Sequence, residues 1–218
     1  VGSEMCIRDR CNSLNETETV VSHPLGKKMK VFNTLTGQKE DFHHRNGVVT
    51  MYVCGITAYD KSHIGHAMTY IIFDVIKRYL GFKGYKVKHV QNFTDIDDKI
   101  IERANQLGMP PAELVNKYTD QYFANMDTLN VERADVYPKA TEEIPKAIEI
   151  IQSLLAKGYA YESEGSVYFR VRNFTDYGRL SHRTLPEMIP KTSNYEEKKE
   201  YPLDFALWKA SKPGEPFW

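Results

Sequence analysis

The chain has 218 residues, 41% of them hydrophobic and 27% charged, a balance typical of globular proteins. Lysine plus arginine equal aspartate plus glutamate at 29 each, which argues against an overall basic field that would attract nucleic acid. No run of about 18 apolar residues occurs, so the sequence predicts no membrane-spanning helix and no membrane partner. This length allows one large domain or one and a half smaller ones.

The cysteines are Cys6, Cys11 and Cys54. An odd and sparse count argues against a disulfide framework and favours a reducing compartment, so we expect a cytoplasmic protein. Cys6 and Cys11 form a C-x4-C pair without further ligands, which does not make a zinc site.

Residues 1–28 are polar and show neither a helical nor a strand period. They also lack the apolar core of a signal peptide. We therefore expect a non-native or disordered tail, a native start at Met29 and a first strand at residues 30–32.

Residues 48–93 predict a βαβ unit with a parallel sheet. Residues 48–54 (VVTMYVC) and 86–93 are the expected strands, and residues 66–80 between them carry apolar side chains at helical spacing. Gly81 is the expected end of this helix. The expected buried face consists of Met68, Ile71, Ile72, Val75, Ile76, Tyr79 and Leu80.

Three further helices and a hairpin are expected after this unit. The helices cover residues 96–107, 111–129 and 141–157, the last with Thr141 as its N-cap. Residues 159–161 and 166–171 flank a turn and predict the hairpin. Residues 176–201 show no strong period. The final Phe217-Trp218 pair is interpreted as a truncation, because apolar ends normally continue into a core.

Residues 51–67 (MYVCGITAYDKSHIGHA) place His63 and His66 at the start of the first helix, next to a strand end. Unpaired N–H groups and the helix dipole favour phosphate at such a position. Imidazoles there could donate hydrogen bonds to phosphate oxygens, and Gly65 would let a ligand approach the backbone. The alternative is a pair of surface histidines whose N–H groups are satisfied by Ser62 or the backbone.

The carboxyl ends of the two strands carry the other candidate groups. Cys54 ends the first strand, although a single cysteine is commonly buried packing. Thr94 follows the second strand, near the same crevice. Behind it, Asp95, Asp97 and Asp98 either surround a helix N-terminus capped by Thr94 or Asp95, which we favour, or hold Mg²⁺.

Three segments together resemble the catalytic domain of the cysteinyl-tRNA synthetase family: MYVCGITAYDKSHIGHA, NFTDIDDKIIERAN and PLDFALWKASKPGEP. The opening FNTLTGQKEDF is similar to that family's first strand and turn. His-Ile-Gly-His is shared by all class I synthetases, whereas the cysteine-glycine step and TDIDDK are specific to the cysteine branch. The resemblance runs from about Met29 to Trp218.

The resemblance implies an α/β fold with a Rossmann-type parallel sheet and helices, interrupted by the start of an inserted α+β connective region. Residues 29–109 would form the first half of the catalytic domain. Residues 110–218 would form the helical and hairpin insertion, truncated at its C-terminus.

The resemblance also implies a cysteine–tRNA ligase, which activates L-cysteine with ATP and Mg²⁺ and transfers it to tRNA(Cys). His63 and His66 would be catalytic, and Cys54 would be one of four Zn²⁺ ligands. The family's remaining zinc ligands and its Lys-Met-Ser-Lys-Ser loop would lie beyond Trp218, so we expect this chain alone to be inactive, and the protein to be a monomer. The implied ATP-binding residues are Thr57, Tyr59, His63, Gly65 and His66, and the implied cysteine-binding residues are Cys54, Gly55 and Thr94.

Two other functions stay open at this point. A related ligase joins cysteine to an amino sugar and shares the histidine motif. A non-catalytic module that binds nucleotide or tRNA would need neither the zinc site nor the loop.

Overall fold

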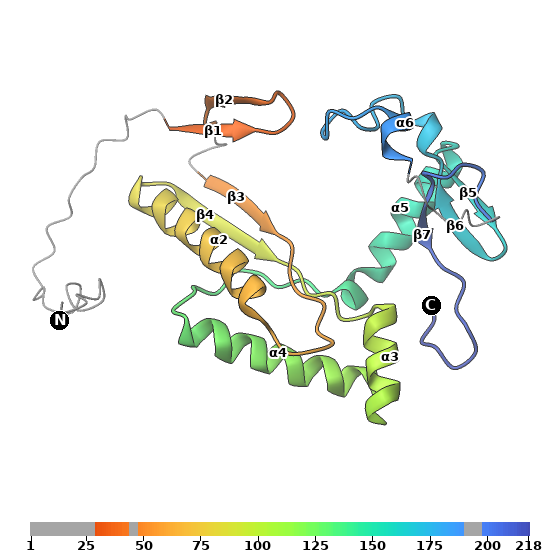
Figure 1. Ribbon diagram of the computed structural model, residues 1–218, viewed down its shortest axis with the longest axis horizontal. Helices are drawn as coiled ribbons and strands as arrows, with labels where there is room; N and C mark the ends of the chain where they lie inside the picture. The colour runs from red at the N-terminus through yellow and green to blue at the C-terminus, as the bar shows by residue number, and fades with distance from the viewer. Residues whose placement is uncertain (1–28, 44–47, 190–197) are drawn as a thin grey trace, which may run out of the picture.

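The computed structural model describes residues 29–43, 48–189 and 198–218. The expected mixed α/β fold, with a parallel pair of strands and helices, is confirmed. The parallel strands lie toward one end of an elongated molecule and a second, antiparallel sheet toward the other (Figure 1). The predictions for residues 1–28 lie outside the described residues. Among the helices that are described, none combines the length and apolarity needed to cross a membrane.

An antiparallel hairpin precedes the parallel strands. It consists of β1 (Lys30–Asn33) and β2 (Gln38–Asp41), so the strand expected at residues 30–32 is confirmed. Just after β1, the carbonyl oxygen of Thr34 lies 2.6 Å from Nε2 of His182. This contact ties the hairpin to a segment almost 150 residues further along the chain.

The βαβ unit is confirmed. β3 (Val48–Val53) pairs in parallel with β4 (Lys86–Gln91), and α2 (Ile64–Phe82) connects them. The other edge of β4 is bordered by a loop, because the amides of Gln91 and Phe93 donate to the carbonyls of Val136 and Pro138.

The predicted buried face of α2 is wrong for every residue except Leu80. Met68 is 61% exposed and Ile72 is 51% exposed, and the other predicted members are also exposed. The helix instead buries Ala67, Tyr70, Asp74 and Leu80. Periodicity identifies residues that share a face, but it does not tell which face meets the sheet. The predicted stop at Gly81 is also early, since α2 ends at Phe82 and Gly84 has the left-handed conformation (φ 87°).

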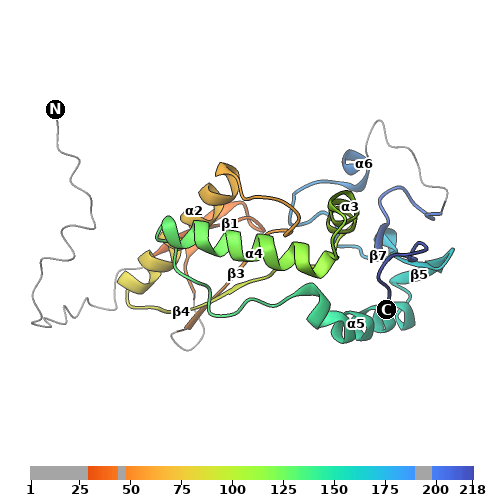
Figure 2. The ribbon, with the colours of Figure 1, turned by 90° about the horizontal axis from the view of Figure 1, so that it is seen from below.

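Two helices complete the core beside the parallel strands. α3 (Asp98–Leu107) leads into α4 (Pro111–Thr128), which runs along the βαβ unit (Figure 2). The expected apolar side of α4 is buried at Leu114, Tyr118, Tyr122 and Met126. Leu129, which we expected on the same side, is 45% exposed and directly follows the helix. The ring of Tyr122 contacts Tyr70 of α2 at 5.2 Å and Phe93 at 5.6 Å, measured between ring centroids. Aromatic packing therefore joins α2, α4 and the end of β4.

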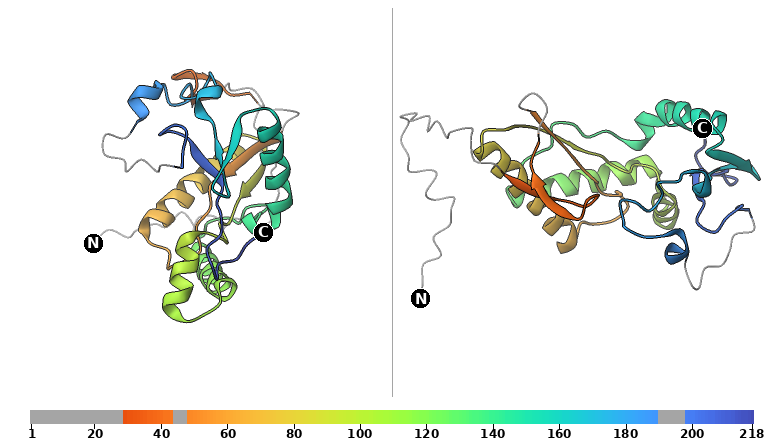
Figure 3. Two further views of the ribbon diagram at one scale, coloured as in Figure 1. Left: turned by 90° about the vertical axis from the view of Figure 1, so that its right-hand side faces the viewer. Right: turned by 90° about the horizontal axis from the view of Figure 1, so that it is seen from above.

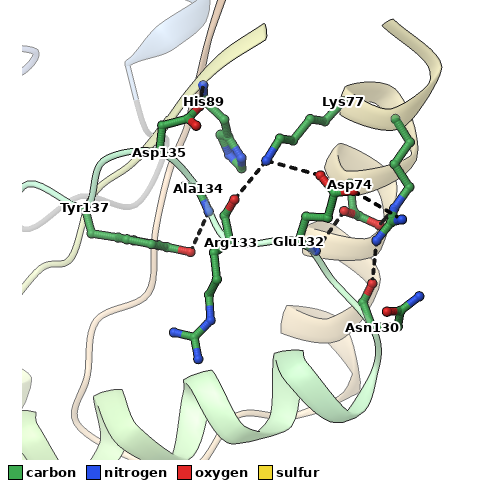
Figure 4. A network of polar contacts seen from close by, with 10 residues as sticks. Asp74, Lys77, His89, Asn130, Glu132, Arg133, Ala134, Asp135 and Tyr137 are labelled. Carbon is green, nitrogen blue, oxygen red and sulfur yellow. Dashed lines mark hydrogen bonds and ion pairs between the residues drawn. The ribbon is translucent and has the colours of Figure 1, made fainter. Parts of the chain in front are cut away.

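A polar network holds α2 against the loop that follows α4 (Figure 4). Asp74 accepts hydrogen bonds from the amide of Glu132 (2.9 Å) and from Nε of Arg78 (2.7 Å). Lys77 donates to the carbonyl of Arg133 at 2.8 Å. The bonds from Glu132 and Arg78 satisfy the buried carboxylate of Asp74, whose burial without partners would cost free energy.

A separate antiparallel sheet is formed within residues 160–208. The 3-10 turn η1 (Ala140–Glu143) and α5 (Ile144–Ala156) precede a sheet of order β5-β6-β7, in which β5 is Ala160–Ser163, β6 is Ser166–Phe169 and β7 is Phe205–Trp208. The predicted hairpin is confirmed as β5 and β6. The prediction that Thr141 caps α5 is wrong, because Thr141 lies inside η1.

Between β6 and β7, the described residues form the short elements η2 (Val171–Asn173) and α6 (Leu185–Met188). The three-stranded sheet packs beside them at one end of the molecule (Figure 3). The buried carboxylate of Asp204 fixes the start of β7, since it accepts from the hydroxyl of Tyr161 and the amide of Val171, both at 2.9 Å.

Candidate active site

Hydrogen bonds join the segments that follow the carboxyl ends of β3 and β4. The amide of Gly55 donates to Oδ1 of Asn92 at 2.8 Å. Beyond it, Thr57 and Thr94 form a parallel bridge, and the amide of Thr94 donates to the carbonyl of Ile56 at 3.0 Å. Two of the implied cysteine-binding residues, Gly55 and Thr94, therefore lie on adjacent chain segments, next to the implied ATP-binding residue Thr57.

Cys54 directly follows β3, and its side chain is exposed. Its carbonyl accepts a 3.4 Å hydrogen bond from the hydroxyl of Tyr70 in α2. Burial raises the pKa of that hydroxyl, which keeps it a donor. Tyr70 therefore fixes the backbone of Cys54 against the helix while leaving the thiol accessible.

The described residues do not form a zinc site. They contain no group of three or more histidine, cysteine, aspartate and glutamate side chains placed to hold a metal ion. A structural or catalytic zinc site needs at least three protein ligands, and Cys54 supplies only one.

The two histidines build the start of α2. His63 is the N-cap residue, and its Nδ1 accepts a hydrogen bond from the amide of Gly65 at 3.1 Å. His66 reaches back, and its Nδ1 accepts from the amide of His63 at 3.2 Å. The arrangement is a capping box made by two imidazoles, whose rings stack with centroids 3.9 Å apart.

The environment disfavours a positive charge on the second imidazole. Partial burial, and after it the neighbouring His63, lower the pKa of His66 below its usual value. The neutral form of His66 is therefore the one that this helix start stabilises at neutral pH.

Gly65 lies against the ring of the N-cap histidine. An added Cβ at Gly65 would lie 2.9 Å from Cε1 and 3.0 Å from Nδ1 of His63. The space above this glycine is occupied by the imidazole of His63. Gly65 therefore makes room for the capping ring.

The three aspartates after β4 make different contacts. Asp97 is the N-cap of α3 and accepts from the amide of Lys99 at 3.0 Å. Asp95 accepts from the amide and hydroxyl of Thr141, at 3.0 and 2.5 Å. The prediction that Thr94 or Asp95 caps the helix is therefore wrong, and the three described carboxylates do not converge on a common ion.

Asp98 contacts a residue near the C-terminal end of the sequence. Its Oδ2 lies 2.7 Å from Nζ of Lys209, which directly follows β7. This ion pair lowers the pKa of Asp98. It joins two of the segments that carry the family resemblance, TDIDDK and FALWK, although they are 111 residues apart.

The loop between Gly55 and His63 contains Tyr59, the remaining residue that the resemblance implies for ATP binding. The ring of Tyr59 lies under Nζ of Lys99, 5.7 Å from the centroid, and Asp60 pairs with Arg103 at 3.6 Å. Both contacts reach α3, so this helix positions the loop.

Sequence reasoning missed Asn92 and Tyr70 as supports of this site. Asn92 lies near the end of a predicted strand, which was a usable signal because asparagine side chains often bond neighbouring backbone groups. Tyr70 lay among residues assigned to the helix without a role, and only its packing identifies it.

The family model of the class I (C) tRNA synthetase catalytic domain matches residues 41–218. The chain belongs to this class I synthetase family. The resemblance predicted from the three segments is thereby confirmed.

Curated relatives of this class I domain are named cysteine–tRNA ligase. The protein from Dehalococcoides mccartyi strain 195 is 56% identical over 192 residues, which is 87% of this chain and 42% of that protein. Those from Thermodesulfovibrio yellowstonii and Thermococcus kodakarensis are each 55% identical and share 87% of this chain with 40% of their own length. The chain thus spans about two fifths of the curated relatives it matches. Among solved structures, methionyl-tRNA synthetase of Mycobacterium tuberculosis with methionyl-adenylate is 23% identical, with a TM-score of 0.48, over 57% of this chain and 25% of that one.

Proposed function

We propose that this chain is part of a cysteine–tRNA ligase. The carboxylate of L-cysteine would attack the α-phosphorus of ATP and release pyrophosphate, and the cysteinyl group would then pass to the terminal adenosine of tRNA(Cys). The observation that carries this proposal is the paired-histidine start of α2 at the carboxyl ends of two parallel strands, in a chain of the class I (C) family.

The helix start would bind and polarise the phosphates of ATP. The proposed ATP-binding residues come from the loop after β3 and the first turn of α2: Thr57, Tyr59, His63, Gly65 and His66. Imidazole N–H groups and the positive end of the helix dipole would stabilise the charge that develops on the α-phosphate. His63 and His66 are the proposed catalytic residues because they alone among these place ring donors there.

The proposed cysteine pocket consists of Cys54, Gly55 and Thr94 at the strand ends. The exposed thiol of Cys54 is available as one Zn²⁺ ligand. The other ligands would have to come from outside the described residues, because these do not complete a site. A zinc–thiolate bond would discriminate cysteine from serine, since thiolates are the softer ligands.

The remaining parts of the proposal follow from the family. Residues 29–109 would be the first half of the catalytic domain, and residues 110–218 the inserted region. ATP would be used with Mg²⁺, and the enzyme would act as a cytoplasmic monomer on L-cysteine and tRNA(Cys).

The direct test is cysteine-dependent exchange of labelled pyrophosphate into ATP by the complete gene product, with Zn²⁺ and Mg²⁺ present. We expect exchange with cysteine and none with serine. His63→Ala and His66→Ala should each lower the exchange rate about 100- to 1,000-fold. His43→Ala, an exposed histidine of the hairpin region, is the matched control and should leave it unchanged. Absence of exchange in the unaltered protein would refute the proposal.

The same preparation separates the related cysteine–amino sugar ligase from the synthetase. Cysteinyl-adenylate formation is common to both reactions. Transfer of labelled cysteine to tRNA(Cys), and none to an amino sugar, would establish the synthetase.

A further inference from the structure

The two imidazoles at the start of α2 use the same ring nitrogen for the same purpose. Nδ1 of His63 accepts from the amide of Gly65, and Nδ1 of His66 accepts from the amide of His63. Both donors are backbone N–H groups at the end of a helix, where no intrahelical acceptor exists for them. Each Nδ1 must therefore present a lone pair.

A neutral imidazole carries one proton on its two nitrogens, so a bare Nδ1 places that proton on Nε2. We propose that the helix cap locks both His63 and His66 as Nε2–H tautomers. Each ring then presents one N–H donor on the side away from the helix backbone. Only the identity of the acceptor, a phosphate oxygen of ATP, rests on the function proposed above.

The stacked geometry supports a neutral pair. The ring planes are 23° apart with centroids at 3.9 Å, so two imidazolium ions would repel each other at short range. A proton on either Nδ1 would also face a backbone N–H and break the cap. The lowered pKa of His66 also favours the neutral ring. The two donors therefore act as fixed hydrogen-bond donors, without carrying charge to the phosphates.

Gly65 is the positioning residue for this arrangement. A Cβ at this position would press on Cε1 and Nδ1 of His63, at 2.9 and 3.0 Å. Gly65→Ala should displace the ring of His63 and release its Nδ1 from the cap. In the His-x-Gly-His spacing, the two histidines thus provide the Nε2–H donors, and the glycine leaves room for the ring of His63.

Nitrogen-15 NMR of the histidine rings in the complete gene product, which includes the histidines of these 218 residues, tests the proposal without any ligand at a pH well above 7. These seven histidines are assigned by single substitution. We expect His63 and His66 to show a pyridine-type Nδ1 and a pyrrole-type Nε2, while exposed His43 shows averaged values. In Gly65→Ala, the His63 signal should move toward that average. A protonated Nδ1 or averaged signals on either histidine in the unaltered chain would overturn the proposal.

A pair of substitutions then separates the cap from the donor. In His63→Asn, the side-chain oxygen can replace Nδ1 as cap acceptor, but nothing replaces the Nε2 proton. We expect unchanged thermal stability and a 10- to 100-fold loss of affinity for ATP with Mg²⁺. In His63→Gln, the amide nitrogen reaches the Nε2 position, so affinity should be better retained and the cap weakened.

These readouts distinguish two failures. Nε2–H tautomers together with no binding of ATP would refute the proposed function and leave the tautomer assignment standing. Equal ATP affinity in His63→Asn and the unaltered chain would overturn the donor role assigned to Nε2.

Discussion

Gly55 and Asn92 pack backbone against backbone where the two parallel strands end. A Cβ on Gly55 would lie 1.5 Å from the carbonyl oxygen of Asn92, so no other residue fits without moving a strand. The amide of Gly55 also donates to the side chain of Asn92 at 2.8 Å. The shape of the proposed cysteine pocket thus depends on the close packing of Gly55 against Asn92.

Gly55→Ala should destabilise the chain by about 3 kcal/mol or more, because backbone cannot yield as a flexible side chain does. Urea unfolding measures this difference. Gly81→Ala is the matched control: it lies inside α2, an added Cβ there meets nothing within 4 Å, and the change should stabilise by about 0.5–1 kcal/mol. Equal effects of the two substitutions would contradict the close approach.

The inverted face of α2 leads to a second prediction. Leu80 is 5% exposed and Ile72 is 51% exposed, although both belong to the stripe predicted to be buried. Leu80→Ala should cost about 2–5 kcal/mol in the free energy of unfolding, and Ile72→Ala less than about 1 kcal/mol. A larger loss for Ile72→Ala, measured by urea unfolding, would mean that the predicted face is the buried one after all.

The contact between Asp95 and Thr141 should couple η1, which leads into α5, to the segment that follows β4. Thermal unfolding of Asp95→Ala, Thr141→Ala and the double variant gives their interaction energy, which we expect at about 1–3 kcal/mol. Asp97→Ala removes the N-cap of α3 and should cost about 1 kcal/mol without coupling to Thr141. An interaction energy near zero between Asp95 and Thr141 would refute the link.

His89 should make the stability of the chain dependent on pH. Its side chain is buried beside Lys77, and neither ring nitrogen has a hydrogen-bond partner among the described residues (Figure 4). Burial and, second, Lys77 lower the pKa of His89, while Asp135 and Asp74 oppose this in part. Below about pH 6.5 the unfolded chain binds the proton more readily, so this contribution to stability is complete above that pH and is lost as the pH falls.

The measurement is the free energy of unfolding at pH 8, 6 and 5 for the unaltered chain and for His89→Leu. One proton contributes at most about 1.4 kcal/mol per pH unit to this slope. We expect a shallower loss of stability in His89→Leu, whose side chain fills the site without titrating. Parallel pH profiles for the two proteins would show that His89 does not cause the dependence.

The elements that the sequence predicted well are those with strong local signals. β3 and β4 are β-rich runs bounded by polar turns, and α4 has a proline start and a regular apolar stripe. The N-caps were predicted less well, because Thr94, Asp95 and Asp97 are all competent cap residues. Which of them caps depends on where the chain turns, and Asp95 is engaged by Thr141, 46 residues away.

The sequence by itself determined the family and the order of the α/β elements, since motif spacing and hydrophobic period are local properties of the chain. Only the tertiary structure decided which side of α2 faces the core, because that depends on β4 and α4 rather than on the helix. It also decided that Nδ1 of His63 and of His66 face the backbone, and that Gly55 meets Asn92. These relationships depend on atomic distances that a one-dimensional pattern does not contain.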